Sequence, residues 1–259
     1  MKRSLYIFLL FFVGQVLLAF FAFGFANFSA LIEGGPLNVD AASFSGEALG
    51  FGSFCSNALL ILSLLLLRLT SPKPFDCFRK GLPSGGALAL VGFLLLSFGM
   101  SFALSPLDLA DFGMEAQFEG MKDSVICVVA ICILAPVAEE LVFREGILRE
   151  MQASGAKPWI AIITSAVCFA VVHGNPMQMV PAAVMGVALG WLYYRTGDVR
   201  LCIPAHILNN SVAMVEMHFP ELDKSIEACS PFLLVPAGAL LIFVGATLLA
   251  KLQPLPSKL

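Results

Sequence analysis

The chain is dominated by apolar runs long enough to cross a lipid bilayer as helices. The first run, residues 4–32, contains no charged residue, and a helix of about 20 residues crosses a hydrocarbon core of about 30 Å. Hydrophobic residues make up 59% of the chain and charged residues 13%, whereas soluble domains carry about 25% charged residues. The sequence therefore predicts an all-α, polytopic integral membrane protein.

About eight such runs form a single predicted transmembrane domain over residues 1–259. The first exceeds the roughly 7 to 15 apolar residues of a signal peptide and is expected to be a retained anchor. Gly174-Asn175-Pro176 predicts the end of one helix and the start of the next. Residues 106–123, acidic with interspersed apolar residues, predict a short interfacial helix. The eight predicted spans cover approximately residues 4–32, 49–67, 85–104, 124–151, 158–173, 176–194, 201–217 and 231–250.

The charges between the spans predict which side of the membrane each loop faces. With eight spans both ends of the chain share one side, and all but two of the 15 Lys and Arg residues fall there. The exceptions, Lys122 and Lys224, lie in loops rich in Asp and Glu. Because positively charged loops stay in the cytoplasm, both termini are predicted to be cytoplasmic. A short chain without further domains favours a bacterial inner (cell) membrane.

The seven cysteines predict neither a disulfide framework nor a zinc knuckle. They are odd in number, lie mostly in apolar runs and form no CxxC motif. We interpret them as small apolar side chains.

Three ionisable side chains lie within the fourth run. Glu139, Glu140 and Arg144 follow residues 124–137, which carry no charge. Such groups cost about 2.5 to 3.5 kcal/mol each to insert, so they predict a functional site. Glu140 and Arg144 are four residues apart, with the acid first, which favours an ion pair on one helix face. Glu139 is rotated by about 100° from Glu140 and is predicted to be left for chemistry.

The same cluster has a structural alternative. It would be a helix end at the cytoplasmic interface, with Glu145, Arg149 and Glu150 continuing a solvated face. Pro136 lies three residues before Glu139 and lacks a backbone N–H. We expect it to free the Cys132 carbonyl and to kink the helix beside the carboxylates.

Two later runs carry histidines with helical partners. Phe169 lies four residues before His173, so the ring is expected to orient the imidazole. His206 and Asn210 are likewise four apart on one face. A single membrane histidine is commonly a structural hydrogen-bonding group, but two of them with Asn210 and an unpaired Glu139, on three helices, indicate a shared site.

These residues form three ordered motifs: Glu-Glu-x-x-x-Arg at 139–144, Phe-x-x-x-His at 169–173 and His-x-x-x-Asn at 206–210. The set resembles the CPBP (CAAX protease and bacteriocin-processing, Abi) family of intramembrane proteases. That family includes the type II CAAX prenyl endopeptidases and bacterial self-immunity proteins. The resemblance covers roughly residues 120–215, the predicted catalytic core.

The resemblance implies hydrolysis of a peptide bond within the membrane by a glutamic-type enzyme without a cofactor. Glu139 would be the general base for a water that His173 helps to bind. His206 and Asn210 would stabilise the oxyanion, while Glu140, Arg144 and Phe169 would give structural support. The expected partners are the lipid bilayer and a membrane-anchored or lipidated protein or peptide, with no nucleic acid.

Other readings remain open from the residues alone. Glu139, His173 and His206 also have the composition of a zinc site with an open fourth position. Non-catalytic peptide binding, as in bacteriocin self-immunity, and proton-coupled transport are further alternatives. From helical rise, Glu139 lies roughly 18 Å and His206 roughly 9 Å from the cytoplasmic ends of their helices, so their convergence requires tilt or the kink at Pro136.

Overall fold

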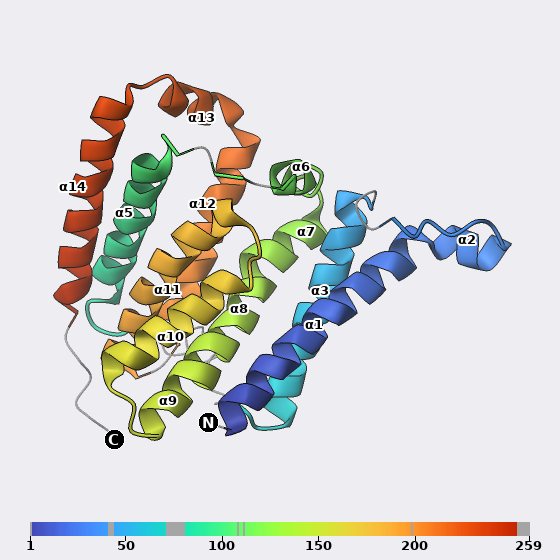
Figure 1. The fold of residues 1–259 in the computed structure, drawn as a ribbon, viewed down its shortest axis with the longest axis horizontal. Helices are drawn as coiled ribbons and strands as arrows, with labels where there is room; N and C mark the ends of the chain where they lie inside the picture. Colours follow the sequence, from blue (N-terminus) through green and yellow to red (C-terminus); the bar gives the residue numbers. More distant parts are fainter. Residues whose placement is uncertain are drawn as a thin grey trace.

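Every regular element that the structure describes is a helix (Figure 1). This computed structural model describes residues 2–40, 44–70, 81–107, 109–110, 112–197 and 199–252. Cys77 and the basic residues Lys73, Arg79, Lys80 and Lys258, which entered the topology prediction, lie outside them. The elements outside the central helix are α1 (Lys2–Ala26), α2 (Phe28–Glu33), α3 (Gly46–Leu66), α5 (Gly86–Leu104), α6 (Met114–Glu119), α10 (Pro158–Val171), α11 (Pro176–Thr196), α12 (Cys202–His218), α13 (Pro220–Glu227) and α14 (Pro231–Ala250).

One continuous helix, Val125–Ala153, passes through the middle of the bundle, and we call it the central helix. It changes register several times along its length. Its parts are α7 (Val125–Val129), η3 (Ala130–Leu134), α8 (Ala135–Glu140), η4 (Leu141–Leu148) and α9 (Arg149–Ala153), where η denotes a π-helical segment. All eight residues of η4 are buried, so this part of the helix forms the centre of the core.

The central helix lies between two groups of helices (Figure 1). α1 and α3 pack on one side of it, and α10 and α12 pack on the other. α5 and α14 lie side by side at the outer edge of the second group. They approach closely because small residues meet, as is common between membrane helices: a Cβ added at Gly99 would lie 2.7 Å from the Gly238 carbonyl oxygen.

A helix is present at each of the eight predicted spans, and the fold is the predicted all-α, multi-pass membrane protein. Among the described residues, six helices are long and apolar enough to cross a membrane by themselves. The other two are α10, with 14 residues, and α12, with 17. Eight crossings and cytoplasmic ends stay predictions. The start of α1 and the end of α14 do lie at the same end of the bundle (Figure 1).

The first predicted span is wrong in its extent, because the helix breaks at Asn27. The Asn27 amide donates to the carbonyls of Phe23 (3.0 Å) and Asn38 (2.9 Å), and its Oδ1 accepts from the Asn38 N–H. A side chain that bonds the backbone on both sides in this way ends a helix. The predicted helix within 106–123 is limited to six residues, Met114–Glu119.

The bundle end that holds the start of α1 carries a network of charged groups. Glu145 is 2% exposed; its carboxylate accepts from Arg149 Nη1 at 2.6 Å and from the Tyr193 hydroxyl at 3.2 Å. Arg3 pairs with Glu150 at 3.4 Å. The alternative interpretation of a solvated face through Glu145 is therefore wrong at that residue, because α11 covers it.

Candidate active site

The local geometry of the site begins with the register of the central helix. The Ala135 N–H donates to the Ala130 carbonyl, five residues back, instead of four. The α-helical turn that follows carries Pro136 near its start and Glu139 and Glu140 at its end. The helix then returns to π register over Leu141–Leu148. Short π segments inside α-helices are frequent at functional sites.

Glu140 and Arg144 form the predicted ion pair. Arg144 Nε lies 3.2 Å from Glu140 Oε2, and both side chains are fully buried. The guanidinium carbon stands 4.8 Å from the centre of the Phe169 ring, which adds a cation–π contact from α10. A buried carboxylate of this kind needs a compensating charge, so the pair holds the middle of the central helix in one arrangement.

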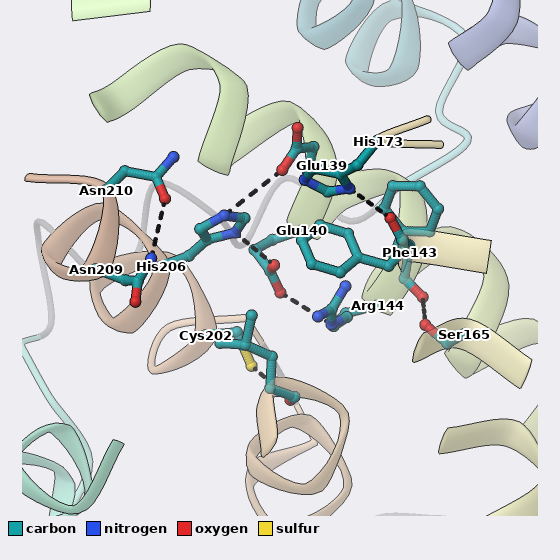
Figure 2. Close-up of polar contacts among 12 residues, drawn as sticks. Glu139, Glu140, Phe143, Arg144, Ser165, His173, Cys202, His206, Asn209 and Asn210 are labelled. Atoms are coloured by element: carbon teal, nitrogen blue, oxygen red, sulfur yellow. Dashed lines mark hydrogen bonds and ion pairs between the residues drawn. The ribbon is translucent and has the colours of Figure 1, made fainter. Parts of the chain in front are cut away.

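Glu140 also binds His206, across the interface between α8 and α12 (Figure 2). His206 Nδ1 and Glu140 Oε1 are 2.9 Å apart. Because an ionised carboxylate can only accept, Nδ1 carries the proton of this hydrogen bond. The second ring nitrogen, Nε2, then faces Glu139 Oε2 at 3.6 Å. A single imidazole thus lies between the two carboxylates, an arrangement that helical spacing alone did not predict.

Glu139 differs from its neighbour in accessibility. Its side chain is 18% exposed, whereas that of Glu140 is completely buried and that of His206 is 3% exposed. Of the two adjacent glutamates, Glu139 is therefore the one that a reactant can reach. Glu140 serves to hold Arg144 and His206.

His173 lies two residues beyond the last residue of α10. Its Nδ1 donates to the Phe169 carbonyl at 2.8 Å, which leaves Nε2 of the neutral ring as an acceptor. The predicted contact with Phe169 is present, with ring centres 4.9 Å apart. Phe169 also packs edge-to-face against His206, at 5.6 Å. Both imidazoles therefore pack against the same aromatic ring.

Asn210 lies on the same helix as His206, but its hydrogen bonds point elsewhere. Its Nδ2 donates to the Ile131 carbonyl in η3 at 3.0 Å. Its Oδ1 accepts from Asn209 Nδ2 at 3.4 Å (Figure 2). Of the four predicted catalytic residues, the structure thus brings Glu139 and His206 into direct contact and joins His173 to them through Phe169. It directs Asn210 toward the backbone of the central helix.

Near Pro136, the carbonyl that a neighbouring helix contacts is that of Ile131, one residue before Cys132, whose carbonyl was predicted to be freed. Counting four residues back pointed to Cys132. The π register at Ala130–Leu134 moves the count, and the carbonyl that takes a bond from another helix is that of Ile131. The sequence contains no simple signal for this register shift.

The alternative zinc set does not come together as a ligand cluster. Within the described ranges, no three His, Cys, Asp or Glu side chains are placed so that they could hold one metal ion. A zinc ion requires nitrogen and oxygen donors at about 2.0 to 2.2 Å. The metal dependence of the protein stays a prediction, which dialysis against a chelator tests.

Comparisons with known proteins point to one family. Residues 122–212 match the family model described as type II CAAX prenyl endopeptidase Rce1-like. A Bacillus subtilis (strain 168) protein described as "Putative membrane peptidase YdiL" is 26% identical over 169 residues, covering 61% of this chain and 67% of that protein. No solved structure matches the chain. All three motifs lie inside residues 122–212, so the family match and the relative both support the resemblance to the CPBP family.

Proposed function

We propose that the protein is an intramembrane endopeptidase in which Glu139 activates the attacking water. The family match and the relative support a membrane peptidase. The role of Glu139 as the base rests on its position. It is the accessible carboxylate, and it faces Nε2 of His206. The other ring nitrogen of His206 is bonded to the buried Glu140, whose charge Arg144 compensates. A general base needs such access together with a fixed partner.

The first chemical step transfers one proton from water. Glu139 accepts that proton as the water oxygen bonds to the carbonyl carbon of the scissile peptide. His173 Nε2, an acceptor in the tautomer that the Phe169 carbonyl sets, accepts a hydrogen bond from the same water. The product of this step is a tetrahedral intermediate whose former carbonyl oxygen bears a negative charge.

His206 is suited to stabilise that oxyanion. In its doubly protonated form it donates from Nε2, and the Glu140 carboxylate at Nδ1 offsets the positive charge of the ring. Such a preorganised donor is commonly worth about 2.7 to 4 kcal/mol in the transition state. Glu139 then returns its proton to the leaving nitrogen as the C–N bond breaks, which regenerates the carboxylate.

The proposed substrate is a membrane-anchored or lipidated protein or peptide. The matching family model is that of type II CAAX prenyl endopeptidases, and a partly exposed acid inside a membrane helix is reachable by a chain that lies in the same bilayer. We propose the bacterial inner membrane as the compartment.

Comparative proteomics of membrane fractions tests this function. Cells that carry the wild-type protein are compared with cells that carry Glu139→Gln, which keeps the shape of the side chain but removes the base. Glu119→Gln is the matched control, because Glu119 is an exposed residue on α6 that pairs with Lys122. We expect an uncut precursor to accumulate with Glu139→Gln alone.

Two other outcomes separate the alternatives. If Glu139→Gln cells keep a bacteriocin-resistance phenotype and no precursor accumulates, the protein is a peptide binder. If no precursor accumulates and proton-coupled uptake of a solute is lost, the protein is a transporter. Either result refutes the peptidase proposal.

A further inference from the structure

The carbonyl of Ile131, inside the central helix, has no backbone donor in either helical register. In an α-helix its donor would be the N–H of Ala135, which bonds Ala130 instead. In a π-helix its donor would be residue 136, a proline without an N–H. In a membrane interior such a carbonyl needs another partner, because an unpaired buried backbone group is costly.

Asn210 supplies this partner from α12. Its Nδ2 lies 3.0 Å from the Ile131 oxygen, and the backbone carbonyl of Asn210 accepts from the Cys132 thiol, with a sulfur–oxygen distance of 3.7 Å. These two contacts join α12 to η3 at one point. His206 lies one turn away on the same helix, and its ring reaches Glu139 and Glu140. The position of α12 along the central helix thus sets where the imidazole stands.

We propose that Asn210 is a positioning residue. It satisfies the carbonyl that Pro136 leaves without a backbone donor, and it thereby fixes α12 so that His206 faces Glu139. This role differs from direct stabilisation of the oxyanion, which the motif resemblance assigns to this asparagine. The proposal rests on the proposed function only for its effect on turnover, while its effect on His206 is structural and can be measured without a substrate.

The proposal makes Asn210 and Pro136 energetically coupled. Replacing Pro136 with alanine supplies an N–H that continues the register begun at Ala135 and can reach the Ile131 carbonyl. In that background the amide of Asn210 is no longer the necessary donor. If Asn210 instead donated to the oxyanion, Asn210→Ala would lower turnover by the same factor whether residue 136 is proline or alanine.

The experiment compares five purified proteins in detergent: wild type, Asn210→Ala, Asn210→Asp, Pro136→Ala and the double variant Pro136→Ala/Asn210→Ala. Asn210→Asp keeps the size of the side chain but, when ionised, cannot donate. The chain has three histidines, so nitrogen NMR of ¹⁵N-histidine samples gives a small, assignable set of ring signals. The His206 signals are assigned by their loss in His206→Gln.

We expect both single Asn210 variants to shift the His206 ring signals, and the double variant to return them toward those of Pro136→Ala. Asn209→Ala, which leaves the bond to Ile131 in place, is the matched control and should leave the His206 signals unchanged. Turnover of the precursor identified by proteomics should fall roughly 100-fold in Asn210→Ala, as for a misplaced catalytic group. The loss should be several-fold smaller when Pro136→Ala is also present.

Unchanged His206 signals in both single variants would overturn the proposal. An equal loss of turnover in the proline and alanine backgrounds would also overturn it and would assign Asn210 to the oxyanion. If the wild-type protein cleaves nothing, the peptidase proposal fails, but the NMR comparison still decides whether Asn210 positions His206.

Discussion

Breaking the buried pair between Glu140 and Arg144 should be among the most damaging single changes in the bundle. In Arg144→Met the apolar stem is kept and the charge is lost. Glu140 is fully buried, and its ion-pair partner lies 3.2 Å away. Removal of one partner of a buried pair costs about 3 to 5 kcal/mol because the other charge stays uncompensated. The contact with the Phe169 ring adds about 0.5 to 2 kcal/mol.

A second substitution separates the charge effect from the packing effect. In Arg144→Met/Glu140→Gln no buried charge is left alone, and the amide oxygen still accepts from His206 Nδ1. We expect most of the lost stability to return, leaving a deficit of about 0.5 to 2 kcal/mol for the lost cation–π contact. Lys224→Met serves as an exposed comparison: its pair with Glu221 is 66% and 83% exposed, and such pairs contribute about 0 to 1 kcal/mol.

The assay is reversible unfolding of each purified variant by SDS titration in mixed micelles, followed by circular dichroism and extrapolated to the free energy of unfolding. The account predicts a large loss for Arg144→Met, substantial recovery in the double variant and almost none for Lys224→Met. A loss below about 1 kcal/mol for Arg144→Met, well under the usual cost of breaking a buried pair, would refute the reasoning. So would a double variant as unstable as the single one.

Two further predictions concern helix packing and a buried hydrogen bond, and a third concerns metal dependence. Gly99→Leu should separate α5 from α14 and lower the unfolding free energy by about 1 to 3 kcal/mol, because the new Cβ would lie 2.7 Å from the Gly238 oxygen. Gly24→Leu is the control and should leave the unfolding free energy unchanged, because nothing lies within 4 Å of a Cβ added there. Equal losses for the two variants in the same SDS assay would contradict this packing. Tyr193→Phe removes a donor 3.2 Å from the buried Glu145 and should cost about 1 to 3 kcal/mol in that assay; an unchanged value would show that the hydroxyl contributes nothing. Exhaustive dialysis against a chelator, verified by metal analysis, should leave cleavage of the precursor at its full rate, whereas loss of activity that zinc restores would revive the metal alternative.

Contacts within one helix turn were predictable from the sequence. The pair Glu140–Arg144 and the contact of Phe169 with His173 both follow from a spacing of four residues, and both are present. The turn at Gly174-Asn175-Pro176 was also predictable, because asparagine is a preferred helix cap and proline a preferred first helical residue: Asn175 caps α11 through a bond from the Met177 N–H.

Contacts between helices were less predictable, because they depend on tilt and register. The bond between His206 and Glu140 joins residues 66 positions apart, and spacing within one helix carries no information about it. Glu139 and His206 lie 3.6 Å apart, despite the difference in depth estimated from helical rise. The shift to π register before Pro136, in which the Ala135 N–H bonds the Ala130 carbonyl, has no local sequence signature.

The burial of Glu145 was missed for a related reason. Its neighbours along the chain are charged and suggest a solvated face. Tyr193, which covers it, comes from α11 and is 48 positions away. A tyrosine near the end of an apolar helix is the only local hint, since buried hydroxyls usually find a partner.

The central claim is that Glu139 removes a proton from water and does not attack the substrate itself. A single turnover of excess enzyme with the identified precursor in H₂¹⁸O tests it, with mass spectrometry of both the cleaved product and the enzyme. The account predicts one ¹⁸O atom in the new carboxyl terminus of the product and none in Glu139. An unlabelled product together with ¹⁸O in the Glu139 carboxylate would contradict it.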